Sequence, residues 1–358
     1  MPETRAEVRL PTKELRDDIP FWTKVLGFRM DSIYPADDPK VAVFSGFGLR
    51  IRIDADATEP PGTVRLLSDD PDAFEAPILT APNGTRVEID TLNPPFVLPD
   101  TDHAFVVRRL ADQAPWIIGR AGMQYRDLIP SRLGGSIIAS HIRIPDGGPV
   151  PDMVHYHTVG FQLIFCYRGW VDLVYEDQGP PFRLHEGNCV IQPPEIRHRV
   201  LFASDNIEVI EIGVPAEHVT TIEQELELPN GYDPDRVFEG QRFVHHKADQ
   251  AKWQPFRLPG FQARDTTINA HTDGVAGVHV VRPVGTAPEW TSHDSDIHFS
   301  FVMSGSLTLE ANASRQLLAA GDAFVVPPGL KTRYSEPSED LELLEVSLPG
   351  TFNTHLEG

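Results

Sequence analysis

Short apolar runs, many of them alternating with polar residues, recur along most of the chain. An alternation with period 2 is typical of strands that bury one face. The 33 prolines and 27 glycines fall mostly between these runs. Because proline and glycine favour turns and interrupt strands, the pattern predicts a mainly β protein with many turns.

The first 100 residues show a different pattern. Apolar residues at helical spacing predict an amphipathic helix from Leu15 to Leu26, which ends before Gly27. One strand is expected before it (8–10) and others after it (40–44 and 49–53). The predicted order is therefore β-α-β-β-β, that of a small α+β domain.

Two segments of this region resemble a known superfamily. Phe21-Trp22 followed by Leu26-Gly27-Phe28, and the later segment NGTRVEI at 83–89, are similar to motifs of the vicinal-oxygen-chelate (glyoxalase/bleomycin-resistance) superfamily. The resemblance implies a βαβββ module. Enzymes of that superfamily take metal ligands from paired modules, whereas this region offers only Glu7 and Glu88 without the expected histidines. We therefore expect a domain without a metal site of its own.

The rest of the chain contains an internal repeat. The segment GMQYRD at 122–127 recurs as GFQARD at 260–265, and each copy follows a tryptophan. Further downstream, matching positions are Gly169 and Gly305, Gly187 and Gly321, the Pro-Pro pairs at 193–194 and 327–328, and the apolar runs at 209–212 and 343–346. A repeat of this length predicts two copies of one β fold, joined by an acidic, turn-rich connector.

Histidines mark the first copy as a candidate metal site. His155 and His157 stand at i and i+2 of an expected strand, so their side chains point to the same face. His198 returns on a later strand, after a glycine-bounded turn and a Pro-Pro pair. Three imidazoles, together with the oxygen of Gln162, can surround one divalent metal in a small barrel.

These residues also match two sequence motifs of the cupins. The first motif, G-x5-H-x-H-x3,4-E-x6-G, appears as His155-x-His157-x4-Gln162-x6-Gly169, with Gly148 one residue further upstream than the pattern. The second, G-x5-P-x-G-x2-H-x3-N, appears as Gly187-x5-Pro193-x-Glu195-x2-His198-x3-Phe202. The chain therefore resembles a bicupin, a protein with two tandem double-stranded β-helix (jelly-roll) barrels. Gln162 departs from the pattern, because many cupins have a metal-binding glutamate there.

The resemblance implies the following organisation. An α+β domain similar to the vicinal-oxygen-chelate module (1–100) precedes a cupin domain with a metal site (101–218), a connector (219–249) and a second, degenerate cupin domain (250–358). In the second copy Thr291 and Thr332 replace His155 and His198, and His293 and His298 match His157 and Gln162. A weak second site could use His293, His298 and His279. His245 and His246, in the connector, are expected to be exposed.

Composition narrows the classes of partner. A net charge of −21 argues against binding to nucleic acid or to anionic membranes. The first residues contain no apolar leader, and no segment approaches the roughly 20 apolar residues of a membrane span. The only cysteines, Cys166 and Cys189, lie in apolar runs and are expected to be buried free thiols, as in a cytoplasmic protein.

A site of three neutral imidazoles and an amide keeps the full charge of its metal, so it favours an anionic bidentate substrate. The main hypothesis is an Fe(II) dioxygenase that cleaves a C–C bond of a small chelating compound, such as a β-diketone or a hydroxylated aromatic acid, as the similarity to ring-cleaving bicupins implies. A Zn(II)- or Mn(II)-dependent isomerase, cyclase or decarboxylase is the first alternative, and a small-molecule-binding bicupin without catalysis is the second. Ni(II) is a further candidate metal. A homodimer is also compatible with the sequence.

Overall fold

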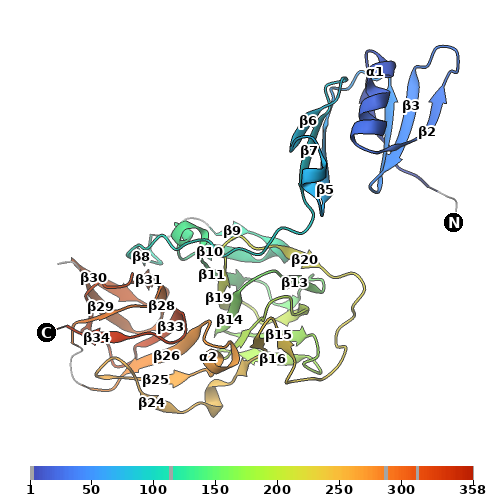
Figure 1. The fold of residues 1–358 in the computed structure, drawn as a ribbon. Coiled ribbons are helices and arrows are strands. Elements are labelled where there is room, and N and C mark those ends of the chain that lie inside the picture. Colours follow the sequence, from blue (N-terminus) through green and yellow to red (C-terminus); the bar gives the residue numbers. More distant parts are fainter. Residues whose placement is uncertain (1–3, 113–115, 286–288, 312–313, 358) are drawn as a thin grey trace. The chain divides into compact units, whose positions relative to one another are not determined.

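Strands make up most of the regular structure, as the sequence pattern predicted (Figure 1). The structure is a computed structural model that describes residues 4–112, 116–285, 289–311 and 314–357. The chain divides into two units, Met1–Phe96 and Val97–Gly358. None of the helices in the described part of the chain has the length and apolar character needed to cross a bilayer.

The first unit begins with the predicted βαβββ order. Its elements are β1 (Val8–Pro11), α1 (Leu15–Pro20), η1 (Phe21–Val25), β2 (Arg29–Tyr34), β3 (Val41–Gly46) and β4 (Leu49–Asp54), with the sheet order β1-β4-β3-β2. The expected helix is α-helical only as far as Pro20 and continues as a π-helical turn, η1, in which Leu26 N donates to Phe21 O, five residues back. Trp22, on this turn, is fully buried against Phe28 and Phe44.

A second, three-stranded sheet completes this unit. Its order is β5-β7-β6, and its elements are β5 (Thr63–Ser68), η2 (Pro71–Ala73), β6 (Ile78–Thr80) and β7 (Arg86–Thr91). Apolar side chains of both sheets form one core. Glu7 comes just before β1 of the first sheet, and Glu88 lies in β7 of the second. Each pairs with an arginine, Glu7 with Arg50 at 3.2 Å and Glu88 with Arg86 at 3.0 Å.

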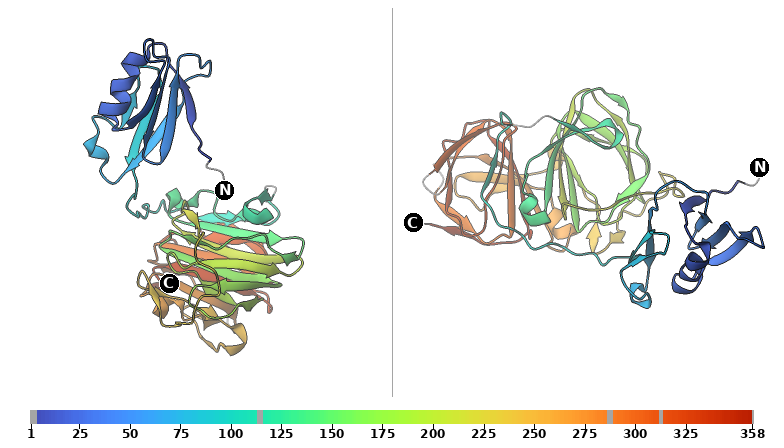
Figure 2. Two further views of the ribbon diagram at one scale, coloured as in Figure 1. Left: turned by 90° about the vertical axis from the view of Figure 1, so that its right-hand side faces the viewer. Right: turned by 90° about the horizontal axis from the view of Figure 1, so that it is seen from above.

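The second unit contains two β barrels, each made of two facing sheets (Figure 2). The first barrel has the orders β23-β17-β14-β19-β11-β10-β9 and β16-β15-β18-β13-β20, with β12 paired to β18. Its elements are β9 (Ile117–Ile118), η3 (Arg120–Gly122), β10 (Gln124–Asp127), η4 (Arg132–Gly135), β11 (Ile138–Ile144), β12 (Gly148–Pro149), β13 (His155–His157), β14 (Phe161–Arg168), β15 (Trp170–Tyr175), β16 (Phe182–His185), β17 (Cys189–Ile191), β18 (His198–Ala203), β19 (Ile207–Val214), β20 (Thr220–Ile222) and β23 (His245–His246).

The second barrel repeats this arrangement. Its sheets are β24-β25-β26-β33-β28-β31-β8 and β30-β29-β32-β27-β34. Its elements are β8 (Val106–Arg108), β24 (Trp253–Pro255), β25 (Phe261–Asp265), α2 (Ile268–His271), β26 (Gly277–Pro283), β27 (Thr291–His293), β28 (Ile297–Ser304), β29 (Ser306–Ala311), β30 (Ser314–Ala319), β31 (Ala323–Val325), β32 (Thr332–Ser335), β33 (Glu342–Leu348) and β34 (Thr354–Leu356). The apolar runs that we matched in the sequence, 209–212 and 343–346, lie in the equivalent strands β19 and β33.

The two barrels exchange edge strands. β8 precedes the first barrel in the chain, yet it pairs with β31 of the second. β23 precedes the second barrel, yet it pairs with β17 of the first. The seven-stranded sheets of both barrels also contribute to a shared apolar core, which includes Phe165 and Phe301. Neither exchange was expected, because strands of two or three residues carry no pattern that identifies their partner.

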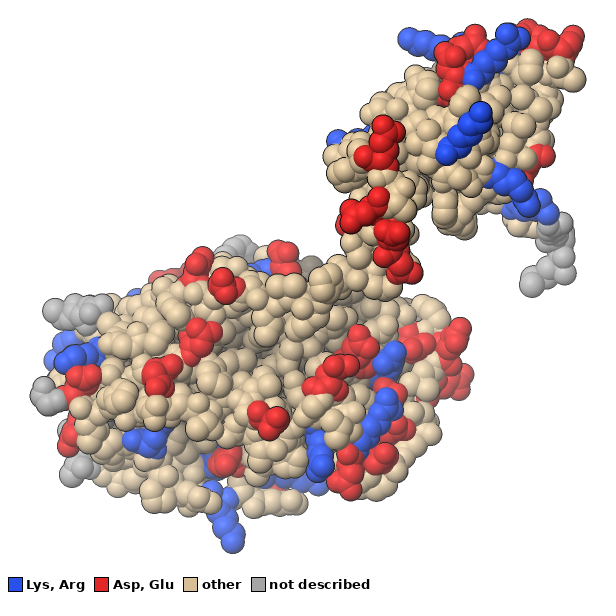
Figure 3. All heavy atoms as spheres, viewed as in Figure 1, with Lys and Arg blue, Asp and Glu red and all other residues tan. Residues whose placement is uncertain are grey.

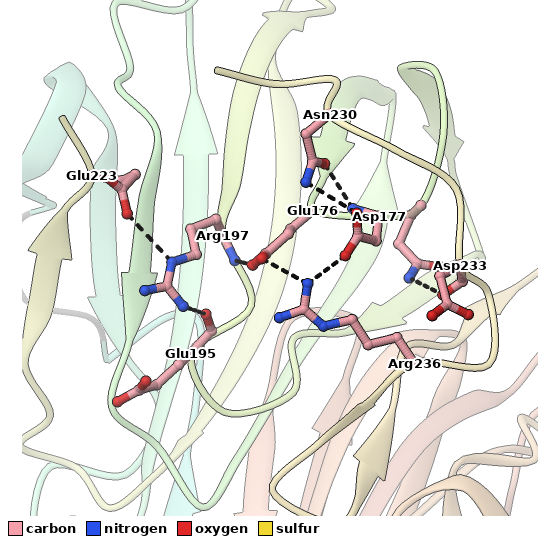
Figure 4. A network of polar contacts seen from close by, with 9 residues as sticks. Glu176, Asp177, Glu195, Arg197, Glu223, Asn230, Asp233 and Arg236 are labelled. Atoms are coloured by element: carbon pink, nitrogen blue, oxygen red, sulfur yellow. Dashed lines mark hydrogen bonds and ion pairs between the residues drawn. The ribbon is translucent and has the colours of Figure 1, made fainter. Parts of the chain in front are cut away.

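The connector lies against the first barrel. Besides β20, it contains a hairpin of β21 (Val237–Phe238) and β22 (Gln241–Arg242). Arg236 pairs with Glu176 at 2.8 Å and also with Asp177, which in turn accepts from Asn230 at 3.0 Å (Figure 4). The expected exposure of His246 is wrong: it is 8% exposed, because β23 joins the sheet.

The surface carries many acidic side chains, as the net charge of −21 implies. On the face drawn in Figure 3, the described Asp and Glu residues are scattered over both units, with Lys and Arg between them. Cys166 and Cys189 are buried and free, as predicted, and burial raises the pKa of each thiol to about 12.

Candidate metal centre

The three histidines of the motif converge inside the first barrel. His155 and His157 point to the same face of β13, and His155 is paired in register with His198, the first residue of β18. The ring centroids of His155 and His198 are 4.2 Å apart, and that of His157 lies 5.1 and 5.2 Å from them. One ligand nitrogen from each ring lies within 4.8 Å of the others. Among the described residues this is the one group of His, Cys, Asp or Glu with such geometry.

The outer nitrogen of each ring is held by the barrel wall. His155 Nδ1 lies 2.7 Å from Met153 O, and His198 Nδ1 lies 2.9 Å from Ile196 O. A carbonyl oxygen only accepts, so each Nδ1 donates and leaves a lone pair on Nε2. His157 Nδ1 is similarly placed 2.9 Å from the Thr220 hydroxyl. Such outer contacts orient metal-binding imidazoles.

Burial also keeps the rings neutral. All three side chains are less than 10% exposed. Burial lowers the pKa of each of them, and for His157 burial and the neighbouring His155 and His218 lower the pKa to about 3. A neutral imidazole is the form that binds a metal.

Two further polar groups, Gln162 and Glu211, are hydrogen-bonded to each other. Gln162 is fully buried, its Nε2 donates to Glu211 Oε1 at 2.7 Å, and its Oε1 has no partner among the described residues. Burial raises the pKa of Glu211, although the bond from Gln162 acts against it. Glu211 makes no ion pair with any described residue. Glu211 lines the same cavity as the three histidines, although its carboxylate is not part of their group of converging ligand atoms. The buried amide oxygen of Gln162 is left without a donor in the part of the chain that the structure describes, which is unusual for a buried polar atom.

A cavity of about 80 Å³ opens beside the histidines. That volume exceeds the space of a single water several times, so it accommodates a small organic molecule or a group of one. Most of its wall is apolar, formed by Met123, Ile142, Ile144, Ile164, Val171, Leu173, Val200, Ile207 and Val209. The polar lining is confined to the histidines, Arg120, Arg143, Gln192, Glu211 and two tyrosines, Tyr125 and Tyr175.

Arg120 is a site residue that the sequence did not predict. It lies in η3, forms an ion pair with the buried Asp152, and places Nη2 3.0 Å from Nε2 of His155. Asp152 is held in turn by Val200 N at 3.0 Å. Arg120 precedes His155 by 35 positions and belongs to no motif, so only the fold shows that the two side chains are in contact.

Tyr175 and Gln192 hold one of the histidines. The Tyr175 ring stacks on His198, with centroids 5.4 Å apart and an angle of 23° between the planes. Gln192 Nε2 donates to the Tyr175 hydroxyl at 2.8 Å, and burial raises the pKa of this tyrosine. The fully buried ring fixes the position of His198 from the side.

The residues between and beside the histidines point away, as expected. Arg197 lies 4.1 Å above the ring of Tyr156 and forms an ion pair with Glu223 at 3.5 Å (Figure 4). It also donates to the backbone oxygen of Glu195 at 2.9 Å. These contacts lie on the outer side of the barrel, so Arg197 is structural.

The second barrel has no comparable centre among its described residues. Thr291 and Thr332 are paired in register where the first barrel pairs His155 with His198. His293 and His298 are close, with centroids 4.6 Å apart. The cavity beside them is about 10 Å³, room for one water at most.

Comparisons with known proteins agree with this architecture. Residues 278–347 match the family described as cupin domain, whereas no curated protein matches the chain in sequence. Salicylate 1,2-dioxygenase from Pseudaminobacter salicylatoxidans is 16% identical, with a TM-score of 0.54 over 73% of this chain and 91% of that chain. Oxalate decarboxylase from Lactobacillus farciminis, as its formate complex, is 14% identical, with a TM-score of 0.53 over 73% and 91%.

A single-residue variant of oxalate decarboxylase from Bacillus subtilis is also similar, with 15% identity and a TM-score of 0.51 over 72% of this chain and 81% of that chain. At these identities the likeness is one of fold. The matched domain and the repeated barrels lead to one conclusion: the chain is a mainly β protein with the cupin-type fold of these bicupin neighbours.

Proposed function

We propose that the chain is a metal-dependent cupin enzyme that cleaves a C–C bond of a small, anionic, metal-chelating substrate in the first barrel. The observation that carries the proposal is the set of three buried imidazoles within 4.8 Å of one another beside a cavity. His155, His157 and His198 would hold the metal through Nε2. The unpartnered Oε1 of Gln162 serves as a fourth ligand or orients the others.

The lining of the cavity indicates what binds there. Its apolar walls exclude water and suit a hydrocarbon body, such as an aromatic ring. The guanidinium of Arg120, beside His155, would attract a carboxylate or an enolate that also reaches the metal. A hydroxylated aromatic acid or a β-diketone combines both features.

Fe(II) is the metal we favour, because oxidative cleavage of a C–C bond needs a metal that can activate O2. Mn(II), Zn(II) or Ni(II) would instead act as Lewis acids. The fold is shared with proteins named as a salicylate 1,2-dioxygenase and as oxalate decarboxylases, so decarboxylation is the second candidate. The mostly apolar wall favours the dioxygenase, since an aromatic ring packs against such a wall better than a small dicarboxylate, although the volume of about 80 Å³ requires the wall to widen for a ring with substituents.

The N-terminal unit has a separate role in this proposal. Its βαβββ order agrees with a vicinal-oxygen-chelate module, and both of its candidate carboxylates, Glu7 and Glu88, are engaged by arginines. We assign it a structural function without a metal.

Metal analysis and oxygen uptake test this function. Protein loaded with Fe(II) under anaerobic conditions should retain one iron per first barrel and consume O2 with one or more hydroxylated aromatic acids or β-diketones. His157→Ala should lose the metal, whereas Thr291→Ala, at the matched face of the second barrel, should retain it. CO2 release without O2 uptake would favour the decarboxylase. A folded protein that retains no divalent metal would contradict both.

A further inference from the structure

The second barrel has polar residues at the positions that correspond to the candidate metal centre of the first barrel. Strand register defines the correspondence: Thr291 opposite Thr332 repeats His155 opposite His198, and His293 opposite Thr354 repeats His157 opposite Thr220. Gln162 and His298 occupy equivalent positions of β14 and β28, opposite Gly213 and Ser347. Glu211 and Glu345 occupy equivalent positions of β19 and β33.

Arg257 lies at the centre of this group. Its Nη2 is 2.8 Å from Nε2 of His298 and 2.7 Å from Oε2 of Glu345. Its Nη1 donates to the Thr354 hydroxyl at 3.0 Å. The guanidinium also lies 4.9 and 4.7 Å from the ring centroids of Phe256 and Phe352, and both contacts restrict its movement.

The guanidinium provides the charge that Glu345 requires. His298 and Glu345 have side chains only 2% exposed, and their Nε2 and Oε2 atoms are 3.1 Å apart. A buried carboxylate needs a positive partner, and arginine keeps its charge at any ordinary pH. In the first barrel the equivalent Glu211 makes no such pair among the described residues, and there the three histidines are placed for a metal.

We propose that Arg257 takes the place of a metal ion in the second barrel and keeps that barrel metal-free. Two imidazoles and one carboxylate, as His293, His298 and Glu345 would provide, are a donor set that binds divalent metals in proteins. With Arg257 in place, His298 and Glu345 are 3.1 Å apart, but the ligand atoms of all three do not lie within 4.8 Å of one another, so an ion would require His293 to move toward the space that the guanidinium leaves. Both ring nitrogens of His293, which is 5% exposed, have no partner among the described residues. With the arginine in place, the cavity of about 10 Å³ leaves no room for an ion and its water ligands.

The inference does not depend on the function of the first barrel, and its test can be separated from it. The background for all variants is the full chain with His157→Ala and His198→Ala, which removes two of the three imidazoles there. The probe is Co(II), whose visible absorption reports coordination by protein ligands and whose content is measured after dialysis by mass spectrometry.

In this background we expect no bound cobalt with Arg257 present. Arg257→Ala should bind one Co(II) per chain, with the appearance of absorption bands, and should gain several degrees in Tm when cobalt is added. Arg257→Lys, which retains a cation, is the matched control and should bind none. Adding His298→Ala to Arg257→Ala should abolish the new site.

Two results would overturn the proposal. One is cobalt bound by the second barrel while Arg257 is intact, recognised by its loss on adding His298→Ala. The other is an Arg257→Ala protein that takes up no cobalt. This holds if the variant is folded, and also if it fails to fold with cobalt present, because binding of the ion to the three donors should restore the fold.

Discussion

Arg120 Nη2 lies 3.0 Å from Nε2 of His155, the ring nitrogen that is left free by the contact of Nδ1 with Met153 O. A metal bound to this nitrogen would require the guanidinium to withdraw. Arg120 pairs with Asp152 through Nη1, not through the Nη2 that contacts His155, and its side chain is 37% exposed. We infer that Arg120 turns from the imidazole toward the anionic group of the substrate.

Arg120→Ala should therefore weaken substrate binding and leave metal retention intact. Loss of one charged hydrogen bond amounts to about 1.5–3 kcal/mol, which corresponds to a KM roughly 10- to 150-fold higher. Arg120→Lys should recover part of the loss. Arg199→Ala, which removes an exposed cation of β18, is the matched control and should leave KM unchanged. An unchanged KM in Arg120→Ala would remove this arginine from the binding site.

The buried histidines make the stability of the metal-free protein depend on pH. The folded-state pKa values of His155, His157 and His198 are lowered by burial, for His157 to about 3, whereas an unfolded chain protonates its histidines near pH 6.5. Between these values the unfolded state binds more protons than the folded state. The free energy of unfolding of the metal-free protein is therefore highest, as far as these rings determine it, above about pH 6.5, and it decreases as the pH falls toward 3.

Urea denaturation of the metal-free protein at pH 7 and pH 5 measures this effect. The midpoint should be lower at pH 5, and the difference should shrink in His157→Gln, which is uncharged at both values. The exposed His355 belongs to no such cluster, so His355→Gln should keep the full difference. Equal midpoints at both pH values in the parent protein would show that folding does not lower the pKa values of these rings.

Contacts of the connector give a third prediction. Arg236 pairs with Glu176 and Asp177 and lies 4.4 Å from the ring centroid of Phe238 (Figure 4). Arg236→Ala should destabilise the attachment of residues 219–249 by about 1–2 kcal/mol, since the pair is partly exposed to solvent. Limited proteolysis should then cleave this segment faster, by about 5- to 30-fold if cleavage follows local opening.

Arg242→Ala is the control for that experiment. Arg242 is on the same segment, and its pairing with Asp235, at 3.8 Å, is long and exposed. Its cleavage rate should stay close to that of the parent protein. Equal rates in both variants would mean that the network around Arg236 does not hold the connector.

The fold class and the histidine cluster could be predicted from the sequence because both depend on local patterns. The alternation of apolar and polar residues in strands, the His-x-His pair and the repeated glycines can each be recognised within a few residues. Positive backbone angles at the repeated Gly169 and Gly305, with φ of 76° and 67°, show why these positions recur. His198 was found through its own motif, although it is 43 residues from His155.

Residues that act through long-range contacts could not be found in this way. Arg120 and Arg257 both lie just before the repeated strand, yet an arginine in a turn is usually solvated, and nothing local indicates that it reaches a histidine. The exchange of β8 and β23 between barrels has the same origin, since the partner of a three-residue strand depends on which sheet edge is open. The burial of His246 followed from that exchange.

The last prediction compares the two equivalent carboxylates, Glu211 and Glu345. Burial alone would raise the pKa of Glu345, but Arg257 and His298 bring it well below its ordinary value. It therefore stabilises the fold above the unfolded-state pKa of about 4.3, and that contribution is lost as the pH falls through the lower folded-state value. Glu345→Gln should leave the guanidinium of Arg257, which is 21% exposed, without its counterion and destabilise the protein by about 1–3 kcal/mol at pH 7.

Glu211→Gln should behave differently in the metal-free protein. Burial raises the pKa of Glu211, and no described cation pairs with it, so removing its charge should be neutral or stabilising. The same change should weaken metal retention, because the carboxylate is then missing as a counter-charge beside the histidines. Chemical denaturation of both variants at pH 7, with and without Fe(II), measures the contrast. If Glu211→Gln destabilised the metal-free protein as much as Glu345→Gln does, Glu211 would have a cationic partner within the protein, and the first barrel would not need an ion to balance it.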